Sequence, residues 1–86
     1  MITVLYKPTF VRQYDQLPGE LKEEVRERVA CFQRNPRLSL LRTHKLKGAL
    51  KGFLSFSVNY RYSIVFQWEN RSTAVLLTVG DHDVYR

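Results

Sequence analysis

The sequence predicts a single small α+β domain, in which an N-terminal strand and two helices pack on one face of a mainly antiparallel sheet of four or five strands. Three observations lead to this fold class. The chain has 86 residues, of which 44% are hydrophobic, and residues 1–86 can therefore build one modest core. Apolar residues recur at helical spacing in the first half and at a spacing of two in the second half. Short turn sequences separate the later strands, which favours antiparallel pairing.

The first half of the chain is expected to hold one strand and two helices. The β-rich run at residues 2–6 is typical of a strand. Pro8 can open a helix, whose apolar stripe comprises Phe10, Tyr14 and Leu17. A second helix is expected between the breakers Pro18 and Pro36, and its apolar stripe comprises Leu21, Val25, Val29 and Phe32. Residues 37–43 show no clear period and are expected to form a loop.

From residue 53 onward the apolar pattern has a period of two. One alternating set is expected to form the buried face of a strand, namely Leu54, Phe56, Val58 and Tyr60. The alternation continues over residues 62–68, and residues 69–71 are expected to form a hairpin turn. Residues 73–79 are almost continuously apolar, as in a central strand buried on both faces. Gly80 is expected to end that strand.

The charge of the chain is unevenly distributed. Its net charge of +6 arises from 14 basic and 8 acidic side chains. No carboxylate lies between Glu27 and Glu69, whereas that stretch contains these basic residues: Arg28, Arg34, Arg37, Arg42, Lys45, Lys47, Lys51 and Arg61. The pattern predicts a positive face suited to phosphates or to an acidic protein. The alternative is a basic surface that only keeps the protein in solution.

Two histidines and one tyrosine are the side chains best suited to chemistry. His44 and His82 each lie where regular structure begins or ends, which places them on the rim of a sheet. Because histidine has a reference pKa of about 6.5, the pair suits acid–base catalysis near neutral pH. Taken singly, each histidine could equally serve as a surface hydrogen-bonding group. Tyr85 could stack on an exposed base or orient a phosphate, the alternative being a frayed end.

Metal, cofactor and membrane functions are not expected. In extended backbone Asp81 and Asp83 point away from His82, and zinc prefers more nitrogen or sulfur ligands than this segment offers. Phosphate-loop, dinucleotide-binding and serine-nucleophile motifs are absent from the sequence. The single Cys31 predicts no disulfide, and no apolar run is long enough for a membrane span. We therefore expect a cytosolic protein.

Several segments together resemble the RelE/ParE superfamily of type II toxin–antitoxin toxins. They are residues 44–48 (HKLKG), 50–53 (LKGF), 58–66 (VNYRYSIVF) and 80–85 (GDHDVY). The resemblance covers essentially the whole chain and is strongest to the YafQ and YoeB types, which cut messenger RNA on the ribosome. It implies a ribosome-dependent mRNA endoribonuclease (an mRNA interferase), which needs no metal and has a small antitoxin protein as its partner.

The resemblance also implies roles for individual residues. His44 falls where YafQ-type toxins carry a histidine and YoeB-type toxins a glutamate. His82 falls on the C-terminal histidine of the family, and Tyr85 on the aromatic residue that ends the active site. Arg61 is expected to lie on the strand that supplies a functional side chain in both types.

The mechanism expected on this basis is attack of the RNA 2′-hydroxyl on the adjacent phosphate. His44 and His82 are expected to form the acid–base pair, with the two roles unassigned. Arg61 and Lys47 are expected to bind the scissile phosphate, because a guanidinium can hold two phosphate oxygens. The side chains expected to follow the RNA backbone are Arg42, Lys45 and Lys51.

Two departures from the family pattern leave other functions open. Many relatives carry a second basic residue near the position of Ser63, and YafQ-type toxins carry a further histidine where this chain has Ser57. A ParE-like inhibitor of DNA gyrase would share the fold without cutting RNA. A catalytically weakened homologue that only binds its antitoxin would also fit the sequence.

Overall fold

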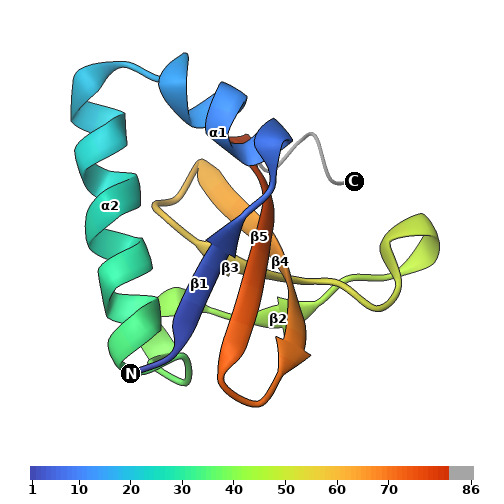
Figure 1. Cartoon of the computed structure of the whole chain (residues 1–86). Helices are drawn as coiled ribbons and strands as arrows, with labels where there is room; N and C mark the ends of the chain where they lie inside the picture. Colours follow the sequence, from blue (N-terminus) through green and yellow to red (C-terminus); the bar gives the residue numbers. More distant parts are fainter. Residues whose placement is uncertain (82–86) are drawn as a thin grey trace.

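The computed structural model describes residues 1–81. Along the chain these residues form β1 (Thr3–Tyr6), α1 (Pro8–Asp15), α2 (Gly19–Arg34), a 3-10 turn (Ser39–Leu41), β2 (His44–Lys45), a second 3-10 turn (Gly48–Leu50), β3 (Leu54–Ser57), β4 (Tyr62–Asn70) and β5 (Thr73–Asp81). The strands form one sheet in the order β1-β5-β4-β3-β2. β1 runs parallel to β5, and every other neighbouring pair is antiparallel. The predicted α+β fold class is therefore confirmed (Figure 1).

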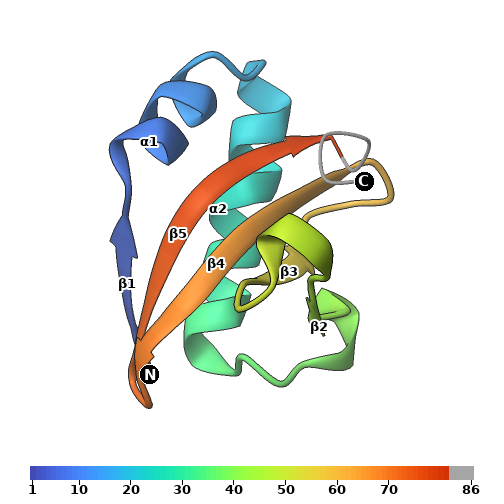
Figure 2. The same ribbon diagram turned by 90° about the vertical axis from the view of Figure 1, so that its right-hand side faces the viewer.

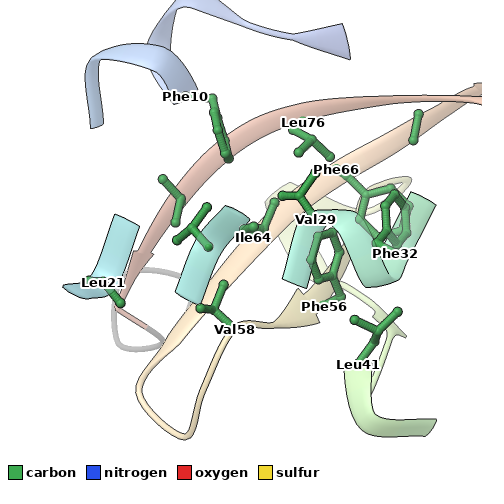
Figure 3. Close-up of a cluster of buried hydrophobic side chains, with 13 residues drawn as sticks. Phe10, Leu21, Val29, Phe32, Leu41, Phe56, Val58, Ile64, Phe66 and Leu76 are labelled. Atoms are coloured by element: carbon green, nitrogen blue, oxygen red, sulfur yellow. The ribbon is translucent and has the colours of Figure 1, made fainter. Parts of the chain in front are cut away.

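The core lies between the two helices and one face of the sheet (Figure 3). The helix side of the core contains the predicted apolar stripe of α2, together with Phe10 of α1. Phe32 is at its centre: its ring stacks on Phe56 at 4.5 Å between centroids and meets the ring of Phe66 edge-on at 4.8 Å. Burial of a side chain of this size stabilises the fold by about 1.5–3 kcal/mol. The second helix is thus held on the sheet by the residues that its sequence spacing predicted.

The bounds of both helices follow from the prolines. Pro8 is the first residue of α1, where the missing N–H and the fixed φ of proline are tolerated. α2 ends at Arg34, and Asn35 is extended because a residue before proline disfavours helical backbone. α1 is further tied to the sheet by Gln13, whose Oε1 accepts a hydrogen bond from the Val79 N–H at 2.9 Å. This contact lies beyond the end of β1, whose last partner on β5 is Leu76.

A turn at residues 58–61 interrupts the alternating pattern and separates β3 from β4. The expectation that Tyr60 belongs to the buried face was wrong, since Tyr60 is 93% exposed. The family resemblance had implied that Arg61 lies on a strand. It lies in this turn instead. The reason is local: Asn59 Oδ1 accepts hydrogen bonds from the N–H groups of Arg61 and Tyr62, both at 2.8 Å. Such a side chain competes with the strand ladder for backbone donors.

The C-terminal hairpin differs from expectation in three details. Its turn lies at residues 71–72, because β4 continues to Asn70. β5 is not ended by Gly80, which pairs with Ser63 of β4 and remains in the strand. β5 is an interior strand, but only its helix-facing side is fully buried, whereas β4 is buried on both faces over residues 63–66. Burial on both faces, which the continuous apolar run had predicted for β5, is thus found in β4, because β4 is the middle strand of the sheet.

No helix in the part of the chain that the structure describes is long and apolar enough to cross a membrane.

Candidate functional site around His44

The sheet face opposite the helices carries small and polar side chains. Residues paired across antiparallel strands share a face, so the strand register defines two rows on this side. One row comprises His44, Ser55, Val65 and Thr78, and the next comprises Ser57, Ser63 and Gly80. We call these seven residues the small-residue face. Ser55 and Ser63 are buried, at 2% and 5% exposure. Figure 2 views the sheet from this side, with the loop between β2 and β3 in front of β3.

His44 lies at the edge of this face, on the short strand β2, and its side chain is exposed. Its Nδ1 lies 3.1 Å from the carbonyl oxygen of Arg42. A carbonyl oxygen can only accept, so the ring nitrogen in this contact must carry the proton. The neutral imidazole then has its lone pair on Nε2. His44 is therefore set up to accept a proton at Nε2 from a bound hydroxyl group.

The carbonyl that orients His44 belongs to a residue with unusual backbone geometry. Arg42 has φ 50° and ψ 41°, in the left-handed region, at the end of the 3-10 turn. This conformation costs a non-glycine residue about 1–2 kcal/mol. The N–H of Arg42 donates to Ser39 O at 3.1 Å, which helps to hold the turn. The strained residue thus aligns its carbonyl with the histidine ring that follows two positions later.

The segment after His44 forms a hollow of about 570 Å³, here called the lysine hollow. It is lined by Lys45, Leu46, Lys47, Gly48, Lys51, Gly52, Phe53 and Leu54. Gly48 (φ 68°) and Gly52 (φ 98°) turn the chain in the left-handed region, which glycine adopts without strain. The turns bring three lysines into the lining of one concavity. A bound anion would relieve the repulsion between these like charges.

Arg61 lies at another part of the sheet. Its Nε donates to Asp81 Oδ2 at 2.9 Å, and this hydrogen bond, followed by the charge of Asp81, raises the pKa of the guanidinium further. Arg61 lies in the turn that follows Ser57, two residues beyond Ser55, the partner of His44 on β3. The lysine hollow extends the other way, from Lys45 opposite Leu54. The lysine hollow and Arg61 therefore lie on opposite sides of the row of His44 along β3.

Two residues near Arg61 were not expected to matter for the site. Sequence reasoning considered Asp81 only as a metal ligand, whereas it is the partner of Arg61. Asn59 also escaped notice, although its Nδ2 donates to Glu24 Oε2 at 3.0 Å and so anchors the turn to α2. Ser57 Oγ donates to Asn59 O at 2.8 Å, so this serine shapes the same turn. The Asn-Tyr-Arg order after an apolar strand was the only sequence signal for a turn here.

An apolar groove of about 510 Å³ runs on the helix side. It is lined by Tyr6, Phe10, Val11, Tyr14, Asp15, Val25, Arg26, Val29, Ala30 and Gln33. Burial, followed by the proximity of Tyr14, raises the pKa of the Tyr6 phenol. This groove and the small-residue face lie on different sides of the sheet.

Several predicted residues cannot be placed in this geometry. His82 and Tyr85 lie outside the described residues. Asp83, which was considered with Asp81 and His82 as a metal ligand, lies outside them as well. Within residues 1–81, no group of three or more His, Cys, Asp or Glu side chains is arranged to hold a metal ion.

The fold is similar to those of solved toxins. YafQ from E. coli matches with a TM-score of 0.79 at 11% identity, over 98% of this chain and 97% of that chain. The RelBE2 toxin–antitoxin complex from Mycobacterium tuberculosis matches with 0.77 at 24%, over 94% and 98%. The YoeB–YefM complex from Staphylococcus aureus matches with 0.73 at 17%, over 95% and 98%. No protein-family model and no curated protein sequence matched the chain.

The chain therefore has the fold of RelE/ParE-like toxins, as the sequence resemblance implied. The YafQ and YoeB types, to which the sequence segments pointed, are both among its structural neighbours.

Proposed function

We propose that this chain is the toxin of a type II toxin–antitoxin system and that it cuts messenger RNA on the ribosome, in the cytosol. The observation that supports this most strongly is the combination, in a toxin fold, of an oriented histidine with a cluster of lysines. His44 has its Nδ1 bound to the Arg42 carbonyl, and the lysine hollow begins at the next residue. A proton acceptor beside fixed positive charge is what cleavage of a phosphodiester by its own 2′-hydroxyl requires.

In the proposed reaction His44 is the general base. Its Nε2 takes the proton of the 2′-hydroxyl, the 2′-oxygen forms a bond to phosphorus, and the bond from phosphorus to the 5′-oxygen breaks. His82 is proposed as the acid that protonates the departing 5′-oxygen. The products are a 2′,3′-cyclic phosphate and a 5′-hydroxyl end, with no metal or cofactor consumed.

The cationic side chains are proposed to hold the RNA. Lys47 would bind the scissile phosphate, and Lys45 and Lys51, which line the same hollow, would bind its neighbours. Arg61 lies on the other side of the row of His44 from the lysine hollow, so it would contact another phosphate of the same strand. Tyr85 is proposed to stack on a base next to the cut. Arg42 is proposed to contact the backbone as well.

The proposed protein partner is an antitoxin. Two of the similar structures are complexes of a toxin with its antitoxin. The apolar groove between the helices would accept the apolar side of a segment that folds on binding. Carboxylates on the same segment would complement the basic surface of this chain.

Primer extension on a reporter transcript after induced expression tests the proposal. We expect new 5′ ends within the reading frame with the unchanged chain, and their loss with His44→Ala or His82→Ala, since an acid or a base typically contributes 10²- to 10⁴-fold. If both variants remained toxic and cut normally, the mechanism would be wrong. A 3′-hydroxyl at the cut would instead indicate attack by water.

The two alternatives give different outcomes. A gyrase inhibitor would stop supercoiling of plasmid DNA by purified gyrase and leave the transcript intact. A weakened homologue that only binds an antitoxin would cause no growth arrest when expressed alone.

A further inference from the structure

A second positively charged hollow lies between the loop after α2 and the C-terminal end of β4. Its volume is about 890 Å³, and its lining comprises Pro36, Arg37, Leu38, Ser39, Arg42, Thr43, Phe66, Trp68, Asn70 and Arg71. We call it the arginine hollow. β3 begins opposite Phe66, so residues 67–70 of β4 have no β3 partner. The early end of this pairing leaves the space that the hollow occupies.

Three arginines line this hollow, and the lining contains no carboxylate. Arg37, Arg42 and Arg71 are all exposed, and none of them forms an ion pair within residues 1–81. Guanidinium groups at one site repel one another unless an anion lies between them. Their planar donors match the oxygens of phosphate groups in particular.

The backbone that carries each arginine is held by local hydrogen bonds. The Arg37 N–H donates to Asn35 Oδ1 at 3.1 Å, and the Arg42 N–H donates to the 3-10 turn. Arg71 lies on the hairpin turn, where Asn70 Oδ1 accepts from Ser72 N at 2.9 Å. Three separate turns thus present positive charge to one volume. Such preorganisation lowers the entropic cost of binding a ligand.

The hollow also has an aromatic wall. Trp68 is half-buried, and its ring contacts Phe66 edge-on at 5.8 Å and Phe32 at 5.9 Å between centroids. These contacts with the core fix the indole while it lines the hollow. A fixed aromatic ring next to phosphate-binding groups is the combination used to bind single-stranded nucleic acids, in which bases stack on the ring and cations follow the backbone.

We propose that the arginine hollow binds a segment of single-stranded RNA, with phosphates against the arginines and a base against Trp68. It would be a second RNA contact, separate from the one at His44. This proposal rests on the proposed function, in which the ligand is also RNA. The volume lies within the range of about 300–1,000 Å³ that holds one small ligand or nucleotide unit. An acidic peptide would satisfy the arginines and leave the indole without a stacking partner, which favours RNA.

Arg42 connects the two contacts. Arg42 is part of the lining of the arginine hollow, and its carbonyl oxygen is bound to the ring of His44. RNA seated in the hollow would therefore hold the backbone that orients the proposed base. Because Arg42 has a strained left-handed conformation, it can contact His44 and line the arginine hollow at the same time.

Trp68 provides a direct readout, because it is the only tryptophan in the chain. The full chain carrying His44→Ala, which is expected not to cut, is titrated with a short oligouridylate while tryptophan fluorescence is recorded. We expect saturable quenching. The double variant with Arg37→Ala and Arg71→Ala should bind at least tenfold more weakly, and its log–log dependence of binding on salt should be shallower by about 1.4, for two lost phosphate contacts. Arg12→Ala on α1 is the matched control and should bind like its parent.

Three outcomes would overturn the inference. The first is RNA binding, seen by anisotropy of a labelled strand, with no change in Trp68 fluorescence. The second is unaltered affinity in the double arginine variant. The third is equal quenching by an oligoglutamate peptide of the same charge, which would assign the hollow to an acidic protein segment. Binding is measured on a variant that is expected not to cut RNA. A negative binding result would therefore leave the cleavage proposal standing. A chain that proved unable to cut RNA would still give an interpretable binding result.

Discussion

Arg61 and Asp81 join the turn after β3 to the last described residue of β5. The contact uses Nε of the guanidinium and Oδ2 of the carboxylate, at 2.9 Å. Within residues 1–81 the two terminal nitrogens of Arg61 make no hydrogen bond. Asp81 therefore fixes the direction of the side chain and leaves the outer part of the fork available to a phosphate. It acts on Arg61 as a positioning residue.

The first prediction concerns this pair. Asp81→Ala should slow RNA cleavage several-fold, because the guanidinium loses the acceptor that orients it but keeps its charge. Arg61→Lys should slow it more, since an ammonium group cannot present two parallel donors. Cleavage rates of a reporter transcript in a ribosome-containing translation reaction measure both effects. Faster cleavage by Asp81→Ala would show instead that Asp81 competes with the phosphate for Arg61.

The second prediction concerns the turn that carries Arg61. Asn59→Ala should lower the free energy of unfolding by about 1–3 kcal/mol, because it removes acceptors from two backbone N–H groups and the tie to Glu24. Urea unfolding followed by circular dichroism measures this change. Glu24→Gln keeps an acceptor oxygen for Asn59 and is the matched control, with an expected change below about 0.5 kcal/mol. An unaltered midpoint for Asn59→Ala would contradict the assigned role.

The third prediction concerns the glycines of the lysine hollow. Gly48→Ala and Gly52→Ala should each cost about 1–2 kcal/mol through backbone strain, since both glycines have positive φ. Steric clash adds nothing, because a Cβ added at either position meets no atom within 4 Å apart from the adjoining residues. Gly48→Asn should be milder than Gly48→Ala, since asparagine tolerates this conformation better. Urea unfolding measures the free energy of unfolding of each variant, and Gly48→Asn should be more stable than Gly48→Ala. The reverse order would refute the strain argument.

The fourth prediction separates stability from binding at one residue. Arg42→Gly should leave the free energy of unfolding unchanged or raise it by up to about 1 kcal/mol, because glycine relieves the left-handed strain while gaining freedom in the unfolded chain. The same variant should quench less on addition of oligouridylate, since one of three guanidinium groups is lost. Urea unfolding and the Trp68 titration measure the two effects. A variant that is less stable and binds normally would contradict both assignments.

Secondary structure was predictable wherever one face of an element repeats apolar residues over several turns or pairs. The helix around Val25 is such a case, because its apolar stripe runs from Leu21 to Phe32 and packs as a unit. The turn at Tyr60 was not predictable from alternation, since one side chain, that of Asn59, diverts the backbone donors. Gly80 stays in a strand because its neighbour on β4 supplies the pairing that local sequence cannot indicate.

The candidate site was predictable in its residue types and less so in its geometry. His44 and the lysines were found from one short run of sequence, residues 44–51, and their closeness in the chain keeps them in one part of the structure. The contact of His44 with Arg42 depends on a backbone conformation that arginine rarely adopts. The arginine hollow depends on where β3 begins and on turns from two distant parts of the chain. The long stretch without carboxylates indicated only two of its arginines, Arg37 and Arg42.

Gln13 accepts from β5 a backbone hydrogen bond that a neighbouring strand would otherwise accept. It satisfies the Val79 N–H where β1 no longer accompanies β5, so that stretch offers one donor fewer to another polypeptide. The opposite edge of the sheet is only the two residues of β2, one of which is the cationic Lys45. Short, charged or capped edges hinder edge-to-edge aggregation. Among the described residues, β1 is only four residues long and residues 67–70 of β4 have no β3 partner, so the sheet offers another chain only short runs of edge.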